Sequence, residues 1–79
     1  MAKIDPLGQE KMYIQVVNVV TERIEIGEYS HRLPAERALA DEFGVAYQTV
    51  RRAMAELRGR GLIITLQGRG TFVTPGSRE

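Results

Sequence analysis

A single glycine divides the middle of this chain, residues 33–57, into two short helical patterns. Before Gly44 the apolar residues Leu39, Ala40 and Phe43 recur at helical spacing, and a glycine can end a helix there because it adopts positive φ without a Cβ clash. After Gly44 a second apolar series repeats every three or four residues: Val50, Ala53, Met54 and Leu57. Two helices joined by a short turn predict a helix-turn-helix, whose second helix can lie in the DNA major groove.

The helix-turn-helix is expected at about residues 36–55. Its first helix should run from about Ala35 to Phe43, with Pro34 opening the helix at its first turn. Its second helix should begin at Ala46 or Tyr47 and end at Arg58, before the next glycines.

An amphipathic helix is predicted ahead of this unit, from about residue 10 to residue 26. Its apolar side follows steps of four, three and four residues: Tyr13, Val17, Val20 and Ile24. Because valine-rich helices have low intrinsic propensity, this helix should depend on packing against the others. Residues 1–9 before it are expected to form a flexible lead-in.

After the three helices the pattern changes to that of a β-hairpin. Aliphatic and β-branched residues predict strands at residues 62–66 and 71–74, with Arg69 at the tip of the glycine-rich turn between them. Proline and glycine then break the pattern, so residues 75–79 are interpreted as the start of a linker. The expected fold is therefore mainly α with a small β-hairpin, a winged helix-turn-helix of three helices plus wing over residues 10–74.

The length of the chain, 79 residues, suits one small domain with room for a core and one surface. The absence of cysteine excludes a disulfide framework or a cysteine-based zinc site and weakly favours an intracellular setting. The chain has neither an apolar run long enough for a membrane span nor the apolar centre of a signal peptide. We therefore expect a soluble, cytoplasmic domain with no metal, no cofactor and no membrane partner.

Charge is distributed unevenly, although the formal net charge is only +1. Residues 1–46 carry five basic and eight acidic side chains, whereas residues 47–79 carry six basic and two acidic ones. Positive charge is thus concentrated in the second helix of the helix-turn-helix and beyond. This asymmetry suits a polyanion on one side of the domain, and a solvated basic face without a partner is the alternative.

Three blocks of sequence resemble the DNA-binding domain of GntR-family bacterial transcription regulators. The blocks are LPAERALADEFGV, TVRRAMAELRGRGLI and QGRGTFV, and the resemblance extends from about Tyr13 to Val73. The ending GRGTFV is most similar to the HutC-like branch. The resemblance implies sequence-specific binding of double-stranded DNA by a transcription regulator, a repressor controlled by a small-molecule effector. It also implies a homodimer of the full-length protein on an inverted-repeat operator, and a C-terminal effector-binding domain outside these residues.

The candidate DNA-binding residues come partly from this resemblance and partly from side-chain chemistry. The resemblance implies contacts from one residue of the first helix, three of the second and one of the wing: Arg37, Gln48, Thr49, Arg51 and Gly68. Chemistry adds residues that can bind a base edge, a phosphate or a groove, or that let the backbone approach DNA: Tyr47, Arg52, Arg69 and Gly70.

Most of these residues also have a simpler structural role as an alternative. Arg51 and Arg52 can grip guanine or phosphate, or can pair with Glu56 or Glu42. Thr49 can cap its helix locally, and Tyr47 can simply cover the helix end. The wing glycines are expected for turn geometry, with close approach to DNA as an added possibility.

Some positions depart from the family pattern. Tyr47 stands where the family very often has arginine. Ala46 replaces the usual serine or threonine, which removes a helix cap worth about 1 kcal/mol. The connector Ser30-His31-Arg32 is shorter than usual and lacks its common glycine.

The sequence also bears on two function classes other than DNA binding. A winged-helix protein-protein interaction module is supported by the weak net charge, by Tyr47 and by the apolar residues Ile64 and Leu66. An enzyme is not expected, because no nucleophile has an adjacent base and no phosphate-binding loop precedes a helix. His31 is the single histidine, and nothing near it in the sequence completes a catalytic or metal site.

Overall fold

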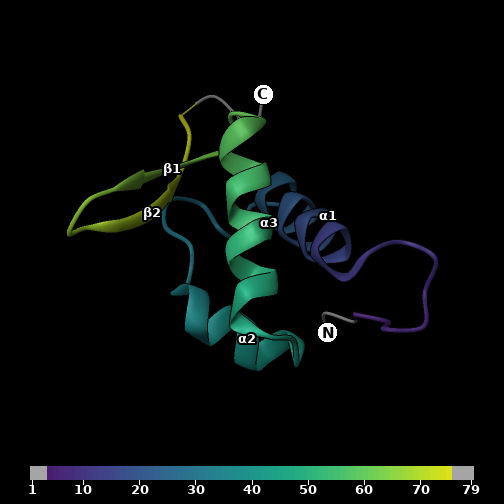
Figure 1. Ribbon diagram of the computed structural model, residues 1–79. Helices are drawn as coiled ribbons and strands as arrows, with labels where there is room; N and C mark the ends of the chain where they lie inside the picture. The colour runs from purple at the N-terminus through teal and green to yellow at the C-terminus, as the bar shows by residue number, and fades with distance from the viewer. Residues whose placement is uncertain (1–3, 76–79) are drawn as a thin grey trace.

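The computed structural model describes residues 4–75, which form three helices followed by a two-stranded antiparallel hairpin (Figure 1). The elements in chain order are α1 (Met12–Glu25), α2 (Glu36–Phe43), α3 (Tyr47–Gly59), β1 (Ile63–Leu66) and β2 (Gly70–Val73). In Figure 1, α3 runs in front of α1, α2 lies at one end of α3, and the hairpin projects to the side. This arrangement confirms the predicted winged helix-turn-helix.

The core is built from the apolar faces of all three helices together with the base of the hairpin. The predicted inward faces of α2 and α3 are buried as expected, including Phe43 at the end of α2 and Leu57 near the end of α3. On α1, Val16 is fully buried although it was not predicted, whereas Tyr13 is only half-buried. The apolar stripe of α1 is therefore wider than the predicted one, and Tyr13 lies at its edge beneath the Arg52 side chain.

The start of α2 differs from the prediction. Ala35 is the residue before the helix, in extended geometry with φ −60° and ψ 150°, so Pro34 precedes the helix and is not in its first turn. The reason is tertiary: the N–H of Leu33 donates to the carbonyl of Thr71 at 2.9 Å, and the isolated bridge Arg32–Phe72 adjoins it. The shortened connector therefore forms a third extended segment beside β2 and stays extended until Ala35.

The turn between α2 and α3 follows the predicted chemistry. Gly44 has φ 67° and its N–H bonds to the carbonyl of Ala40, which closes α2. Ala46 precedes α3 in extended geometry without any side-chain cap, as its apolar methyl predicts. The first-turn N–H groups of α3 thus lack the side-chain acceptor that serine or threonine would supply.

The hairpin register pairs Ile63 with Val73 and Leu66 with Gly70. Both strands begin one residue away from their predicted starts. Each strand has four residues, and the N–H of Thr74 still donates to the carbonyl of Leu62 at 3.0 Å beyond them. The buried ends of the two strands anchor the wing to the core, while its tip is exposed.

The described part of the lead-in, residues 4–9, folds back toward the start of α1. The Gln15 side chain accepts a hydrogen bond from the N–H of Asp5 at 2.6 Å and donates to the carbonyls of Asp5 and Glu10 at 2.8 and 2.9 Å. Residues 1–3 of the predicted lead-in and residues 76–79 of the predicted linker lie outside the described residues. The flexibility of the lead-in stays a prediction. Within residues 4–75, no helix combines the length and the apolar character needed to cross a bilayer.

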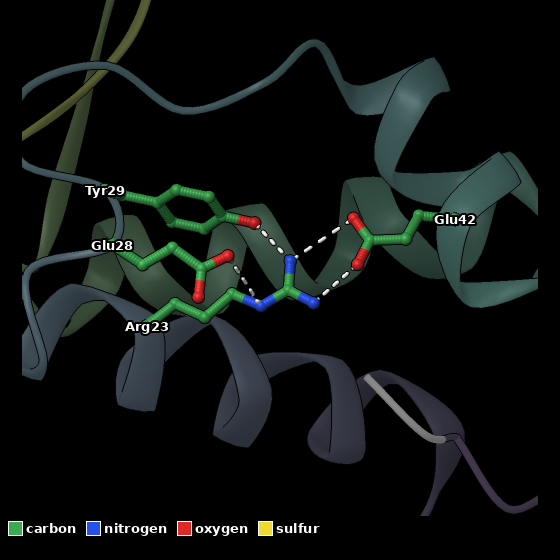
Figure 2. A network of polar contacts seen from close by, with 4 residues as sticks. All are labelled: Arg23, Glu28, Tyr29 and Glu42. Atoms are coloured by element: carbon green, nitrogen blue, oxygen red, sulfur yellow. Dashed lines mark hydrogen bonds and ion pairs between the residues drawn. The ribbon is translucent and has the colours of Figure 1, made fainter. Parts of the chain in front are cut away.

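A polar cluster joins α1, the connector and α2 (Figure 2). The Arg23 side chain is only 12% exposed. Its guanidinium group donates to both carboxylate oxygens of Glu42 and to the Tyr29 hydroxyl, and lies 3.6 Å from a carboxylate oxygen of Glu28. The same guanidinium lies 5.3 Å from the centroid of the Phe43 ring. The cluster therefore fixes the C-terminal end of α2 against α1, which sets the position of the helix-turn-helix on its support.

Candidate nucleic-acid interface

One side of α3 is committed to the core, and the opposite side presents polar and cationic groups. Val50 and Leu57 are fully buried, whereas Gln48, Arg51 and Arg52 are exposed. Figure 1 shows α3 along one face of the molecule, with no other element in front of it. The predicted recognition helix is thus open to a partner along its length.

The start of α3 brings together two arginines from different helices. The guanidinium carbon of Arg37, on α2, lies 4.6 Å from the centroid of the Tyr47 ring, and that of Arg51, one turn further along α3, lies 5.9 Å from the same centroid. Both arginines are exposed and Tyr47 is half-buried. We call these three side chains the Arg37–Tyr47–Arg51 cluster. A ring face attracts a cation at this range, so Tyr47 contacts both arginines favourably.

A groove, here called the α2–wing groove, separates the start of α2 from the hairpin. Six of the residues that line it are Arg32, Arg37, Tyr47, Thr65, Gly70 and Thr71. Gly70, Arg37 and Tyr47, three of the predicted site residues, thus line the same groove. A Cβ built on Gly70 would lie 2.9 Å from the end of the flexible Arg32 side chain, which can move away, so it is the φ of 119° that favours glycine at this position.

The remaining candidates on α3 face a different hollow. Gln48, Thr49 and Arg52 line it together with Tyr13 and residues of the lead-in. The Arg52 guanidinium carbon lies 4.1 Å from the Tyr13 ring centroid. The successive arginines of α3 therefore diverge, with Arg51 over the Tyr47 ring of α3 and Arg52 over the Tyr13 ring of α1.

The tip of the wing forms a third, separate location. Gly68 has φ 76° with open space around the position of a Cβ, and Arg69 is exposed beside it. The N–H of Arg69 donates to the carbonyl of Leu66 at 2.8 Å, which closes the turn. Gly68 is thus required by its backbone conformation, and neither residue lines the α2–wing groove.

Acidic neighbours do not neutralise the arginines of the site. Glu42 is paired with Arg23, and Glu56 is paired with Arg60 at 2.9 Å, so the carboxylates considered as partners of Arg51 and Arg52 are both engaged elsewhere. No salt bridge within residues 4–75 includes Arg37, Arg51 or Arg52. These guanidinium groups keep an uncompensated charge on an exposed face, which suits an anionic partner.

The comparison with known families agrees with this geometry. The family described as "Bacterial regulatory proteins, gntR family" matches residues 12–73, which span all three helices and the hairpin. The chain belongs to the GntR family. Its winged helix-turn-helix therefore has the architecture of a known group of bacterial regulators.

Individual relatives of this GntR-family chain include repressors. It is 37% identical over 68 residues to the histidine utilization repressor of Pseudomonas putida, covering 84% of this chain and 27% of the relative. It is 39% identical over 70 residues to the HTH-type transcriptional repressor NagR of Bacillus subtilis, covering 86% of this chain and 29% of the relative. The chain thus spans less than a third of the length of these relatives.

A solved structure extends the comparison to a protein seen with DNA. The DNA-binding domain of AraR in complex with operator ORX1 superposes with a TM-score of 0.81 at 34% identity, covering 89% of both chains. The match thus covers nearly the whole of a domain that was solved on its operator.

Two arginines of this GntR domain lie next to the candidate residues although the sequence did not predict them. Arg32 lines the α2–wing groove and its guanidinium carbon lies 5.7 Å from the Phe72 ring centroid. Arg58 donates to the Thr65 hydroxyl at 3.0 Å, so it connects the end of α3 to β1. The position of Arg32 directly before the block LPAER was an available signal, whereas the Arg58 contact depends on how the hairpin folds back.

Proposed function

We propose that this chain reads operator DNA for a bacterial transcription repressor, with α3 in the major groove and the wing on the neighbouring backbone. One observation carries the proposal: the exposed face of α3 presents Arg51 and Arg52, Arg37 shares the Tyr47 ring with Arg51, and no carboxylate neutralises these arginines within the described part of the chain. The operator-bound domain of AraR and the repressors among the relatives support it.

The proposed contacts follow the three locations of the interface. In the first, Arg37 and Arg51 are placed for a phosphate and a base edge, since a guanidinium can bind either one with two parallel hydrogen bonds. In the second, Gln48 and Thr49 meet base edges or backbone, and Arg52 meets a phosphate. In the third, the wing tip at Gly68 and Arg69 approaches the adjacent sugar-phosphate backbone, with Gly70 next to it at the start of β2.

We also propose how the full-length protein acts. A homodimer would place two copies of α3 on the half-sites of an inverted-repeat operator, because two-fold symmetry in the protein matches two-fold symmetry in the site. A small-molecule effector would act through a C-terminal domain and release or restore DNA binding. The protein would act in the cytoplasm and would have no enzymatic activity of its own.

Selection of bound duplexes from a random pool, followed by affinity measurements at several salt concentrations, tests DNA reading directly. We expect one sequence pattern to be enriched, and the logarithm of the association constant to fall linearly with the logarithm of the salt concentration. Enrichment of no sequence, or an affinity that salt does not change, would reject the proposal.

A protein-binding winged helix is the competing function, and one observation favours it. On β1, Ile64 and Leu66 are 40% and 41% exposed on the same face of the strand, which is apolar area that DNA does not need. Such a module should enrich no duplex in the same selection, so a single experiment separates the two functions.

A further inference from the structure

We infer that Tyr47 is a positioning residue, whose ring holds Arg37 and Arg51 as one ordered pair of guanidinium groups for DNA. This inference rests on the proposed function and gives a role to a residue whose own contact with DNA was left open by its sequence. It concerns how two arginines from separate helices come to act together.

The Tyr47 ring contacts one arginine from α2 and one from α3, two helices that are joined only by a short turn. Tyr47 is the first residue of α3, Arg51 lies one turn later, and Arg37 comes from the first turn of α2. The guanidinium carbon of Arg37 lies 4.6 Å from the Tyr47 ring centroid, and that of Arg51 lies 5.9 Å from it. Tyr47 also lines the α2–wing groove together with Arg37, and its half-burial restricts the ring.

The Tyr47 ring is the group that both guanidinium groups contact. Neither arginine takes part in a salt bridge within residues 4–75, and two nearby cations repel each other. A tyrosine face carries partial negative charge, so it attracts both guanidinium groups and offsets this repulsion. A leucine would leave a smaller apolar side chain in place and remove this attraction.

The consequence is a smaller entropic cost of binding. An exposed arginine has many rotamers, and fixing it on DNA loses that freedom. A side chain already ordered against the ring loses less, so preorganisation increases affinity without any new contact to DNA. The attraction is made by the ring and not by the hydroxyl, so phenylalanine should preserve it.

The test measures binding of the 79-residue chain to the duplex that the unsubstituted chain selects. Tyr47→Phe should bind within about twofold of the unsubstituted chain, whereas Tyr47→Leu should bind about fivefold or more weakly, as expected for two exposed cation–π contacts. Thermal unfolding of each variant shows whether it remains folded. In a chain that already carries Arg37→Ala and Arg51→Ala, Tyr47→Leu should have no further effect, because it acts through these arginines.

A second measurement does not require DNA. In the nuclear magnetic resonance spectrum of the free chain, the side-chain methylene protons of Arg37 and Arg51 should show aromatic ring-current shifts. Tyr47→Phe should preserve these shifts, and Tyr47→Leu should abolish them. Glu25→Leu provides a surface control, because Glu25 is exposed on α1 and lines neither the α2–wing groove nor the hollow beside Gln48.

Three outcomes would overturn the inference while the proposed function stands. Equal losses in Tyr47→Phe and Tyr47→Leu would mean that the hydroxyl binds DNA itself. Unchanged binding by Tyr47→Leu, or a full further loss in the chain lacking both arginines, would mean that the ring does not act through them. By contrast, failure of the unsubstituted chain to enrich any duplex would reject the proposed function, and the role of the pair on DNA with it.

Discussion

Arg23 on α1 and Glu42 on α2 form a paired hydrogen-bond contact that ties the supporting helix to the helix-turn-helix (Figure 2). Because Arg37 is on the same short helix as Glu42, the pair also helps to fix where Arg37 meets Tyr47. The arrangement of the proposed interface therefore depends on a polar contact that lies outside it.

The first prediction concerns stability in acid. The hydrogen bonds from Arg23 lower the pKa of Glu42 below its usual value. A carboxyl whose pKa is lower in the folded state stabilises the fold fully above its unfolded pKa, and this contribution is lost as the pH falls through the folded pKa. The free energy of unfolding should therefore fall as the pH decreases from about 5 toward 3.

Denaturant unfolding of the unsubstituted chain and of Glu42→Gln at several pH values measures this effect. Glu42→Gln should be less stable at neutral pH and should lose less stability on acidification. Glu25→Gln is the matched control, because Glu25 is exposed on α1 and takes part in no salt bridge of residues 4–75. The same acid dependence in Glu42→Gln and in the unsubstituted chain would contradict the assignment.

The second prediction separates base reading from general attraction at Arg51. Arg51→Ala should cost about 1–3 kcal/mol in binding to the selected duplex and should relax the preference at one base position. Arg60→Ala is the control, because Arg60 is exposed near the end of α3 and is already paired with Glu56. An Arg51→Ala chain that selects the same sequences as the unsubstituted chain would remove Arg51 from the base-reading residues.

The third prediction is that Arg52 binds a phosphate and not a base, because Arg52 lies over Tyr13 on the α1 side of α3. A phosphate contact carries no sequence information, so Arg52→Ala should weaken binding to all duplexes by a similar factor. The slope of log affinity against log salt should become shallower by about 0.9, the value for one lost phosphate contact. A changed base preference, or an unchanged slope, would contradict this role.

The fourth prediction uses the missing cap of α3. Ala46 already has the extended backbone of a capping residue but offers no acceptor, so Ala46→Ser should stabilise the fold by about 1 kcal/mol. Ala55→Ser is the matched control, because Ala55 is exposed inside α3, where serine should cost about 0.5 kcal/mol. Chemical denaturation of the two variants measures both changes. A loss of stability in Ala46→Ser would contradict the prediction that a serine side chain caps the start of α3.

Local patterns were sufficient to predict the elements and most of the core. The spacing of Val50, Ala53, Met54 and Leu57 predicted the buried face of α3, because helical periodicity depends only on neighbours along the chain. Gly44 marked the end of α2 for a similarly local reason, since its left-handed conformation disfavours other residues. The start of α2 was missed because it depends on a contact between Leu33 and a strand far along the sequence.

The sequence by itself determined which residues could form the interface, namely exposed arginines and small polar groups around one helix. Only the tertiary structure decided how they are grouped: Arg37 and Arg51 on the Tyr47 ring, Arg52 on the Tyr13 ring, and Arg32 against Gly70. The physical reason is that a long cationic side chain reaches several neighbours. Which of them it meets depends on the packing of whole helices, and the periodicity of one helix contains no information about that.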